Sequence, residues 1–374
     1  MFKNFWYALA FSDEITNKPS QHRLLGQDLV LYRGSDGKAR ALSDVCIHRG
    51  APLSSGWVEN DTVVCPYHGW GYNGEGVCTR IPALRQGRPL SKKARVDAYP
   101  VEERHGWIWV FPGDIPEAER VPIPNLEFMD DPSFRQLRGE WHWDANFERV
   151  VENGTDIAHT PWVHGTSFGN RDEPEVEDLD IESWDWGAKL TAIQRPPQKA
   201  GGLFKRKHQG RPPEVTVSTA FFFPSIVMID IQLSIGRQII WDTNIPLDEN
   251  TTLTKWVGLR NFFTGGWADR IARKRVLDIF AQDDEIVKRI KPELIPPELS
   301  GELHLKSDGM SLEYRRCRQA AVDRGWSVIG TAAGGPSERT VIASPGRTQE
   351  GLSNAWVLKP TPEGTGAIPT SSRN

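Results

Sequence analysis

Alternating apolar and polar residues predict short β-strands through the first part of the chain. Residues 27–33 alternate in this way, and a Gly-Ser-Asp-Gly turn at 34–37 separates them from a second strand over residues 39–45. A further strand, residues 106–111, stops at a Pro-Gly-Asp turn. The pattern predicts a β-rich first domain over residues 1–115.

The pattern changes after this domain. Residues 116–133 are rich in proline and acidic side chains, which predicts a linker. A domain of mixed type follows over residues 134–330, with strands predicted at 134–143, 215–233 and 237–263 (the last broken by a turn at 247–250) and helices at 146–158 and 267–290. Residues 195–213 look irregular, and residues 331–374 are expected to form a variable, partly disordered tail.

Composition narrows the class of protein. Of the 374 residues, 38% are hydrophobic and 25% charged, which is typical of a globular protein. The net charge of −4 predicts no general attraction to nucleic acid or to an acidic membrane. The apolar run near the N-terminus ends at Ser12-Asp13-Glu14, too short for a membrane span. Four cysteines in so long a chain do not make a disulfide scaffold, so we expect a reducing, cytoplasmic location.

The strongest chemical signal is a pair of short motifs in the first domain. Cys46 and His48 form a C-x-H motif, and sixteen residues later Cys65 and His68 form a C-x2-H motif. Two thiolates on one iron and two imidazoles on the other make a Rieske [2Fe–2S] cluster. The alternatives are a Cys2His2 zinc site, although zinc fingers use other spacings, and a chance grouping of buried cysteines with surface histidines.

The two remaining cysteines have no such setting. Cys78 is expected to be a small core residue, and Cys317 matches no motif.

A second group of metal-binding residue types begins on the predicted helix 146–158, as the pattern N-x2-D-x2-H-x4-H. His159 and His164 are candidate imidazole ligands. Asp156, three residues before His159, is placed to orient that imidazole through a hydrogen bond. Pro161 is expected to break the helix and to bring His164 back toward His159. The alternative is two polar residues beside an interface.

A third ligand is predicted on the helix 267–290. At about 100° per residue, Asp283 falls in the middle of the apolar face, Asp284 on its flank and Glu285 opposite. A charge in an apolar face is costly unless it is paired or binds a metal. Two histidines and one carboxylate with open positions form the facial set of non-haem iron(II) oxygenases. A helix cap or a buried salt bridge at Asp283 is the alternative.

With these motifs in place, the chain resembles the Rieske-type non-haem iron oxygenases. The stretch from Cys46 to Trp70 (CIHRG…CPYHGW) is similar to their cluster-binding segment, and residues 153–164 and 280–283 are similar to their iron-binding segments. Gln282 departs from the Glu that family members more often carry. The resemblance implies a fold of the α+β class, a Rieske β-sandwich followed by a helix-grip (START-like) catalytic domain.

The resemblance also implies roles for individual residues. Cys46 and Cys65 would bind one iron of the cluster, and His48 and His68 the other. The mononuclear iron would be held by His159, His164 and Asp283. Asn153 would sit beside that iron, and Asp156 would bridge His159 to His68 of a neighbouring subunit.

The function that the resemblance implies is that of a terminal oxygenase component. O2 and a small apolar or aromatic substrate would meet at the mononuclear iron(II), with electrons coming from a ferredoxin or flavin reductase through the cluster. The chain looks more like hydroxylating or demethylating monooxygenases than like ring-dihydroxylating dioxygenases, and a homotrimer is implied. Three alternatives remain at this stage: a dioxygenase, a Rieske electron carrier without an active site, and a zinc-stapled binding module.

Overall fold

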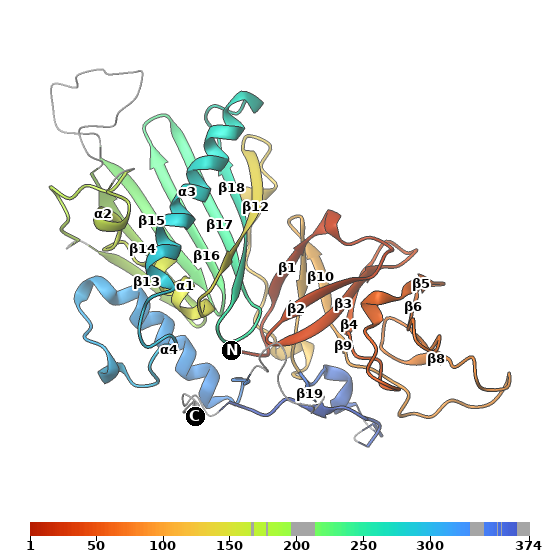
Figure 1. Cartoon of the computed structure of the whole chain (residues 1–374). Coiled ribbons are helices and arrows are strands. Elements are labelled where there is room, and N and C mark those ends of the chain that lie inside the picture. The colour runs from red at the N-terminus through yellow and green to blue at the C-terminus, as the bar shows by residue number, and fades with distance from the viewer. Residues whose placement is uncertain are drawn as a thin grey trace. The chain divides into compact units, whose positions relative to one another are not determined.

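The computed structural model describes residues 1–165, 168–176, 179–195, 214–329, 340–349, 351–352 and 354–364. The chain forms two compact units, both drawn in Figure 1. The described residues of the first unit lie within Met1–Asn125, Ile245–Glu249 and 324–364, and those of the second lie within Leu126–Asn244 and Asn250–Asp323. The division at Asn125 and Leu126 falls inside the stretch expected to be a linker, whereas the irregular segment expected at 195–213 lies almost wholly outside the described residues.

Residues Met1–Asn125 of the first unit contain three small antiparallel sheets. One has the order β1 (Tyr7–Phe11), β11 (Trp107–Val110), β10 (Val101–Arg104). The second has the order β2 (Ser20–Leu24), β3 (Gln27–Arg33), β4 (Ala39–Ser43), β9 (Ala98–Tyr99). The third has the order β5 (Trp57–Glu59), β6 (Thr62–Val64), β7 (Gly71–Tyr72), β8 (Cys78–Arg80).

The strands predicted from the sequence in this unit correspond to β3, β4 and β11. Leu29, Val30, Leu31 and Tyr32 of β3 are all buried, so both faces of this central strand lie in the core. The core beside the cysteines includes Cys78, which is buried as expected.

Part of the expected tail belongs to the first unit. Arg347 forms an ion pair with the buried Asp97 at 2.7 Å, and the Ser344 hydroxyl donates to the same carboxylate at 2.8 Å. The Ile342 N–H donates to the side chain of Gln27 at 2.8 Å. Strand β19 (Thr340–Val341) pairs with β20 (Lys359–Pro360), so ordered structure continues beyond residue 331 in the described part of the chain.

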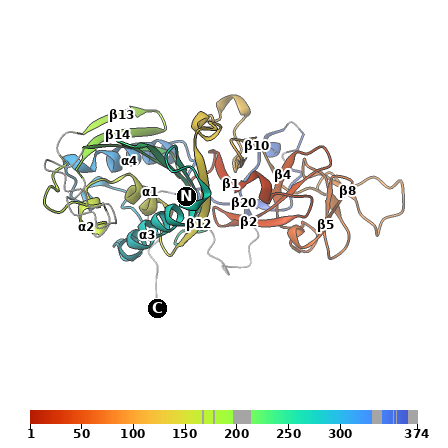
Figure 2. The same cartoon turned by 90° about the horizontal axis from the view of Figure 1, so that it is seen from above.

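The second unit is a seven-stranded sheet with helices packed on one face (Figures 1 and 2). The strand order is β12 (Arg135–Trp143), β18 (Thr252–Arg260), β17 (Gly236–Pro246), β16 (Ile226–Leu233), β15 (Val215–Phe222), β14 (Gly187–Gln194), β13 (Asp180–Trp184). The helices are α1 (Phe147–Thr155), α2 (Thr160–Val163), α3 (Asp269–Val287) and α4 (Gly309–Asp323).

Cross-strand pairing defines the face that the helices cover. Phe221 pairs with Val227, and Val227 pairs with Asp242, so these three side chains lie on the same side of the sheet. Phe221 packs against Tyr314 of α4, while Val227 lies beside Gly154 of α1. Residues 220–223 form an apolar run that packs in the core, because Phe221 and Phe223 are buried against Tyr314.

The sequence prediction was wrong at residues 215–233, which form a hairpin of β15 and β16 rather than one strand. Both strands are apolar, so the pattern runs on through the connection. Pro224, which has no N–H to donate to a ladder, interrupts the pairing, and the turn spans residues 223–225.

Candidate metal centres

The first centre is formed by two loops that close in the same way. Cys46 follows β4; its carbonyl accepts from Gly50 N–H at 2.8 Å, and its N–H donates to Ala51 at 3.0 Å. Cys65 follows β6 with the matching pair, a carbonyl bonded to Gly69 N–H at 3.0 Å and an N–H bonded to Trp70 at 2.8 Å. Gly50 and Gly69 have φ of 77° and 70°, a conformation that glycine adopts without strain.

These loops bring the four predicted ligands into one region. Both cysteines are buried, and the rings of His48 and His68 lie 4.4 Å apart, centroid to centroid. The ring of His48 stacks on Trp70 at 4.7 Å. Burial, together with the nearby charges of His68 and Arg49, lowers the pKa of His48 and favours the neutral imidazole that binds metal.

The donor set fits a two-iron cluster. Nδ1 of His48 is buried and has no hydrogen-bond partner among the described residues. The Cys46 sulfur lies 3.2 Å from the Tyr72 hydroxyl, which can donate to a thiolate. Burial raises the pKa of the Cys46 thiol, although the hydrogen bond from Tyr72 opposes this shift. The buried thiolate is therefore stable only beside a positive charge such as a metal ion.

The second centre begins at the end of α1. The side chain of Asn146 caps the start of this helix by accepting from Glu148 N–H at 3.0 Å. The helix ends at Thr155, earlier than the predicted residue 158, and Asp156 is its C-cap. We had expected Pro161 to break this helix, but the helix ends six residues before it. Pro161 lies in the first turn of α2, where a missing N–H costs nothing, and His159 is the N-cap of that turn.

Three predicted ligands converge. Nε2 of His159 lies 3.3 Å from Nε2 of His164. Oδ1 of Asp283 lies 3.2 Å from His164 Nε2 and 3.5 Å from His159 Nε2. Three atoms at these separations can all lie about 2.0–2.2 Å from one ion, the distance usual for nitrogen and oxygen ligands. Among the described residues, these three form the one such group of histidine, cysteine and acidic side chains.

Burial supports a cation at this point. Asp283 is 5% exposed, and its Oδ1 has no hydrogen-bond partner among the described residues. Asp284 is partly covered and pairs with Lys288, and Glu285 is exposed, as the helical periodicity predicts. Ile286, an apolar residue on the same helix, is exposed. Burial lowers the pKa of His164, but Asp283 and Gln282 outweigh it and raise that pKa, so the site attracts positive charge.

Gln282 orients His164 through a hydrogen bond. Asp156 lies close to His159 without the expected hydrogen bond, and Nδ1 of His159 is buried with no hydrogen-bond partner among the described residues. Oε1 of Gln282 lies 2.9 Å from Nδ1 of His164, so an Nδ1–H donated to it turns the lone pair of Nε2 toward Asp283. A carboxylate oxygen of Asp156 lies 3.4 Å from Nδ1 of His159, and its other oxygen accepts from Ala158 N–H at 2.7 Å. The role of Gln282 was missed from the sequence, where it appeared only as a departure from the resemblance.

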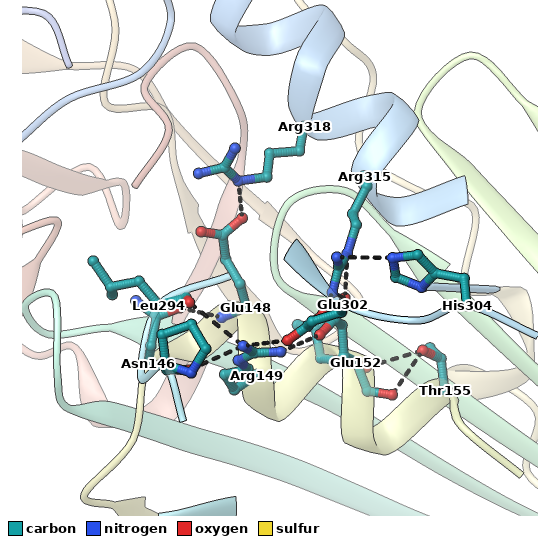
Figure 3. A network of polar contacts seen from close by, with 12 residues as sticks. Asn146, Glu148, Arg149, Glu152, Thr155, Leu294, Glu302, His304, Arg315 and Arg318 are labelled. Carbon is teal, nitrogen blue, oxygen red and sulfur yellow. Dashed lines mark hydrogen bonds and ion pairs between the residues drawn. The ribbon is translucent and has the colours of Figure 1, made fainter. Parts of the chain in front are cut away.

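A buried ionic network supports α1 from its other side (Figure 3). Arg149 pairs with Glu152 at 3.1 Å and with Glu302 at 2.8 Å. Arg315 of α4 pairs with the same two carboxylates. Arg318 pairs with Glu148 at 3.0 Å. The network ties the helix that leads into His159 to α4 and to the segment before it.

A small cavity of about 40 Å³ lies between α1, α3 and the inner face of the sheet. Asn153 of α1 and Asp283 of α3 line it, so the structure brings the predicted Asn153 beside a candidate metal ligand. The volume holds only a few waters, so the walls must move apart for a larger molecule to enter. Its remaining lining is Trp143, Val150, Gly154, Val227, Ile229, Ile240, Asp242, Asn244, Val276, Ile279 and Phe280.

A larger hollow of about 430 Å³ lies between β14 and the segment that follows α2. Phe168, whose ring stacks on His164 at 4.8 Å, is in its lining. None of the three candidate ligands lines it. The smaller cavity, which contains Asp283, is therefore the better candidate for the place of reaction.

Fold and sites together define a protein with a cluster-binding domain and a separate mononuclear metal domain. Two family models match the chain in that order: the Rieske [2Fe-2S] domain over residues 5–100, and the vanillate O-demethylase oxygenase C-terminal domain over residues 143–324. The chain belongs to the Rieske-type non-haem iron oxygenases, whose cofactors are a [2Fe–2S] cluster and a mononuclear iron. The predicted fold class is confirmed.

Individual relatives support the same family assignment. The chain is 38% identical over 175 residues to the vanillate O-demethylase oxygenase subunit of a Pseudomonas species (strain HR199 / DSM 7063), covering 46% of this chain and 48% of that one. It is 40% identical over 162 residues to the oxygenase component of dicamba O-demethylase from Stenotrophomonas maltophilia, covering 43% and 47%. The matches span about half the length of these two relatives.

One relative and one solved structure match over a longer stretch. Methylxanthine N1-demethylase NdmA of Pseudomonas putida is 27% identical over 325 residues, 84% of this chain and 87% of that protein. The crystal structure of dicamba monooxygenase bound to 3,6-dichlorosalicylic acid superposes with a TM-score of 0.72 at 25% identity, covering 85% of this chain and 97% of that one. Among the described helices, none combines the length and apolar character needed to cross a membrane.

Proposed function

We propose that the protein is the terminal oxygenase component of a multicomponent system that hydroxylates or oxidatively demethylates a small apolar or aromatic molecule. The observation that carries this proposal is the convergence of His159, His164 and Asp283, of which Asp283 also lines a cavity with mainly apolar walls. Iron(II) held there would supply the O2 chemistry, and the cluster would supply electrons one at a time.

The protein's own residues have distinct tasks in this proposal. Cys46, His48, Cys65 and His68 hold the cluster, and His159, His164 and Asp283 hold the iron. Asn153, which lines the same cavity as Asp283, sits beside the iron. Asp156 lies close to His159. The apolar walls exclude water from the reacting atoms.

The type of reaction follows from the relatives and from the second domain. Several relatives are named as demethylases or monooxygenases, which favours insertion of one oxygen atom over ring dihydroxylation. A pure electron carrier has no need for a second domain in which three metal-ligand types converge. Ring dihydroxylation and pure electron transfer are the alternatives.

Further partners and context belong to the proposal. The electron donor is an NAD(P)H-dependent reductase, with or without a ferredoxin. The oligomer is a homotrimer in which Asp156 links His159 to His68 of the next subunit. The location is cytoplasmic, because none of the four cysteines is paired in a disulfide.

Removing one ligand tests the iron site. His159→Ala or Asp283→Ala should lower the iron content from about three to about two per chain and abolish product formation, because the facial set is broken. The visible spectrum of the cluster should not change, because its ligands come from other loops. Metal analysis, the visible spectrum and mass spectrometry of products from a substrate panel with a surrogate reductase provide the readouts.

Asp284→Ala is the matched control, since Asp284 is the next residue on α3 and pairs with Lys288 instead. It should keep its iron and most of its activity. Equal loss of iron in the Asp283 and Asp284 variants would refute the ligand assignment. A native protein with only the cluster's two irons would favour the electron carrier.

A further inference from the structure

Besides Asp283, the cavity contains a second carboxylate that the iron site does not use. Ile240, Asp242 and Asn244 alternate along β17, so their side chains share the face that α1 and α3 cover. Asp242 is 6% exposed and Asn244 is 1% exposed. A carboxylate buried this far is costly unless a partner compensates it.

A directed chain of hydrogen bonds ends on this carboxylate. Trp143 Nε1–H can only donate, and it donates to the Thr254 hydroxyl at 2.7 Å. The hydroxyl hydrogen of Thr254 is therefore free to donate to Oδ1 of Asn244. The Asn244 amide then turns its NH2 group toward Oδ1 of Asp242, at 2.8 Å.

The direction of this chain determines what Asp242 offers to the cavity. Each donor points toward Asp242, so the carboxylate is the terminal acceptor. Asn244 is the one hydrogen-bond partner found for it among the described residues, which leaves Oδ2 for a ligand. No lysine, arginine or histidine is in the cavity lining within the described part of the chain.

The acidic lining of the cavity also favours a ligand that donates a hydrogen bond. Its two titratable side chains, Asp242 and Asp283, are both acidic. Burial raises the pKa of Asp242 to about 7, against the opposing hydrogen bond from Asn244. An empty cavity leaves this acceptor without its second partner. Above about pH 7, where Asp242 is ionised, an anionic guest beside it would face a like charge.

We propose that Asp242 anchors the substrate by accepting a hydrogen bond from an N–H, O–H or ammonium group. The substrate class is thus an apolar ring compound with a hydrogen-bond donor, and carboxylates and sulfonates are disfavoured. The term substrate rests on the proposed oxygenase function. The binding preference itself does not depend on that function.

Three matched probes test this preference: guaiacol, which carries a hydroxyl donor; veratrole, its methylated counterpart without a donor; and 2-methoxybenzoate, an anion. Binding is measured by calorimetry on the iron-loaded protein without O2 or reductase. Guaiacol should bind at least tenfold more tightly than either of the others. In Asp242→Asn, Asn244 still donates to the new amide oxygen, so an NH2 group faces the cavity and the order should reverse in favour of the acceptors.

Reversal separates recognition from damage, because a merely weakened fold would lower all three affinities together. Asp230→Asn is the matched control: Asp230 lies on β16, points to the opposite face from Ile229, and pairs with Arg237 at 2.6 Å. It should keep the native order. The proposal is overturned if the native protein prefers veratrole or 2-methoxybenzoate, binds none of the probes, or if Asp242→Asn keeps the native order. Failure of turnover in a protein that still prefers guaiacol would count only against the oxygenase function.

Discussion

At the scale of single residues, Asp242 should make the stability of the protein depend on pH. Burial raises its folded-state pKa from 3.8 to about 7, although the Asn244 hydrogen bond opposes the shift. The folded protein therefore binds this proton more tightly than the unfolded chain, and stability falls as pH rises from about 4 to about 7.

Asp242→Asn should remove that loss. In iron-free protein, the variant should gain roughly 2–4 kcal/mol relative to the native protein at pH 8 and little at pH 4.5, since a pKa unit is worth about 1.4 kcal/mol. Denaturant unfolding at both pH values measures this. Asp283, the other titratable residue in the cavity, is present in both proteins and largely cancels in the comparison. An identical difference at the two pH values would contradict the assignment.

At the scale of elements, the position of α1 depends on buried charge. Arg149, Arg315 and Glu152 are almost fully covered, and the two arginines share the carboxylates of Glu152 and Glu302. Desolvation cancels much of the attraction in such a network, but removing one member leaves a buried charge uncompensated. The network thus restricts α1 to the position from which the chain continues to Asp156 and His159.

Arg315→Ala should cost about 3–5 kcal/mol in the free energy of unfolding, because Glu152 loses a buried partner. Arg289→Ala is the control: its pair with Glu285 on α3 is exposed and screened by solvent, so its loss should be much smaller. Urea denaturation of both variants gives the comparison. Equal and small losses would mean that the network does not hold α1.

At the scale of the whole molecule, the proposed trimer predicts complementation between dead subunits. A His68→Ala chain has no intact cluster, and a His159→Ala chain has no intact iron site. If the cluster of one subunit serves the iron of the next, mixed oligomers should recover part of the activity, because a head-to-tail ring brings intact halves together. Co-expressed chains, verified by mass to be mixed, are assayed for product. Mixtures as inactive as either parent would show that transfer stays within one chain.

The sequence alone was sufficient wherever the signal is local. The motifs at Cys46–His48 and Cys65–His68 predict the cluster, because the backbone hydrogen bonds that shape each loop are formed within that loop. Asp283 could be chosen over Asp284 and Glu285 because a helix repeats regularly, and the face it buries follows from spacing. Strands β3, β4 and β11 followed from alternation and turn residues for the same reason.

Only the tertiary structure decided what depends on residues distant in the chain. Asp242 and Asn244 are two polar residues in an apolar strand until Trp143 and Thr254 supply the other half of their hydrogen-bond chain. Gln282 can bond to His164 only because α3 packs beside that residue, which lies 118 positions away in the chain. Ser344 and Arg347 join the first unit through Asp97 for a similar reason. Periodicity records which face of an element is buried, whereas the partner across that face is set by how the elements pack.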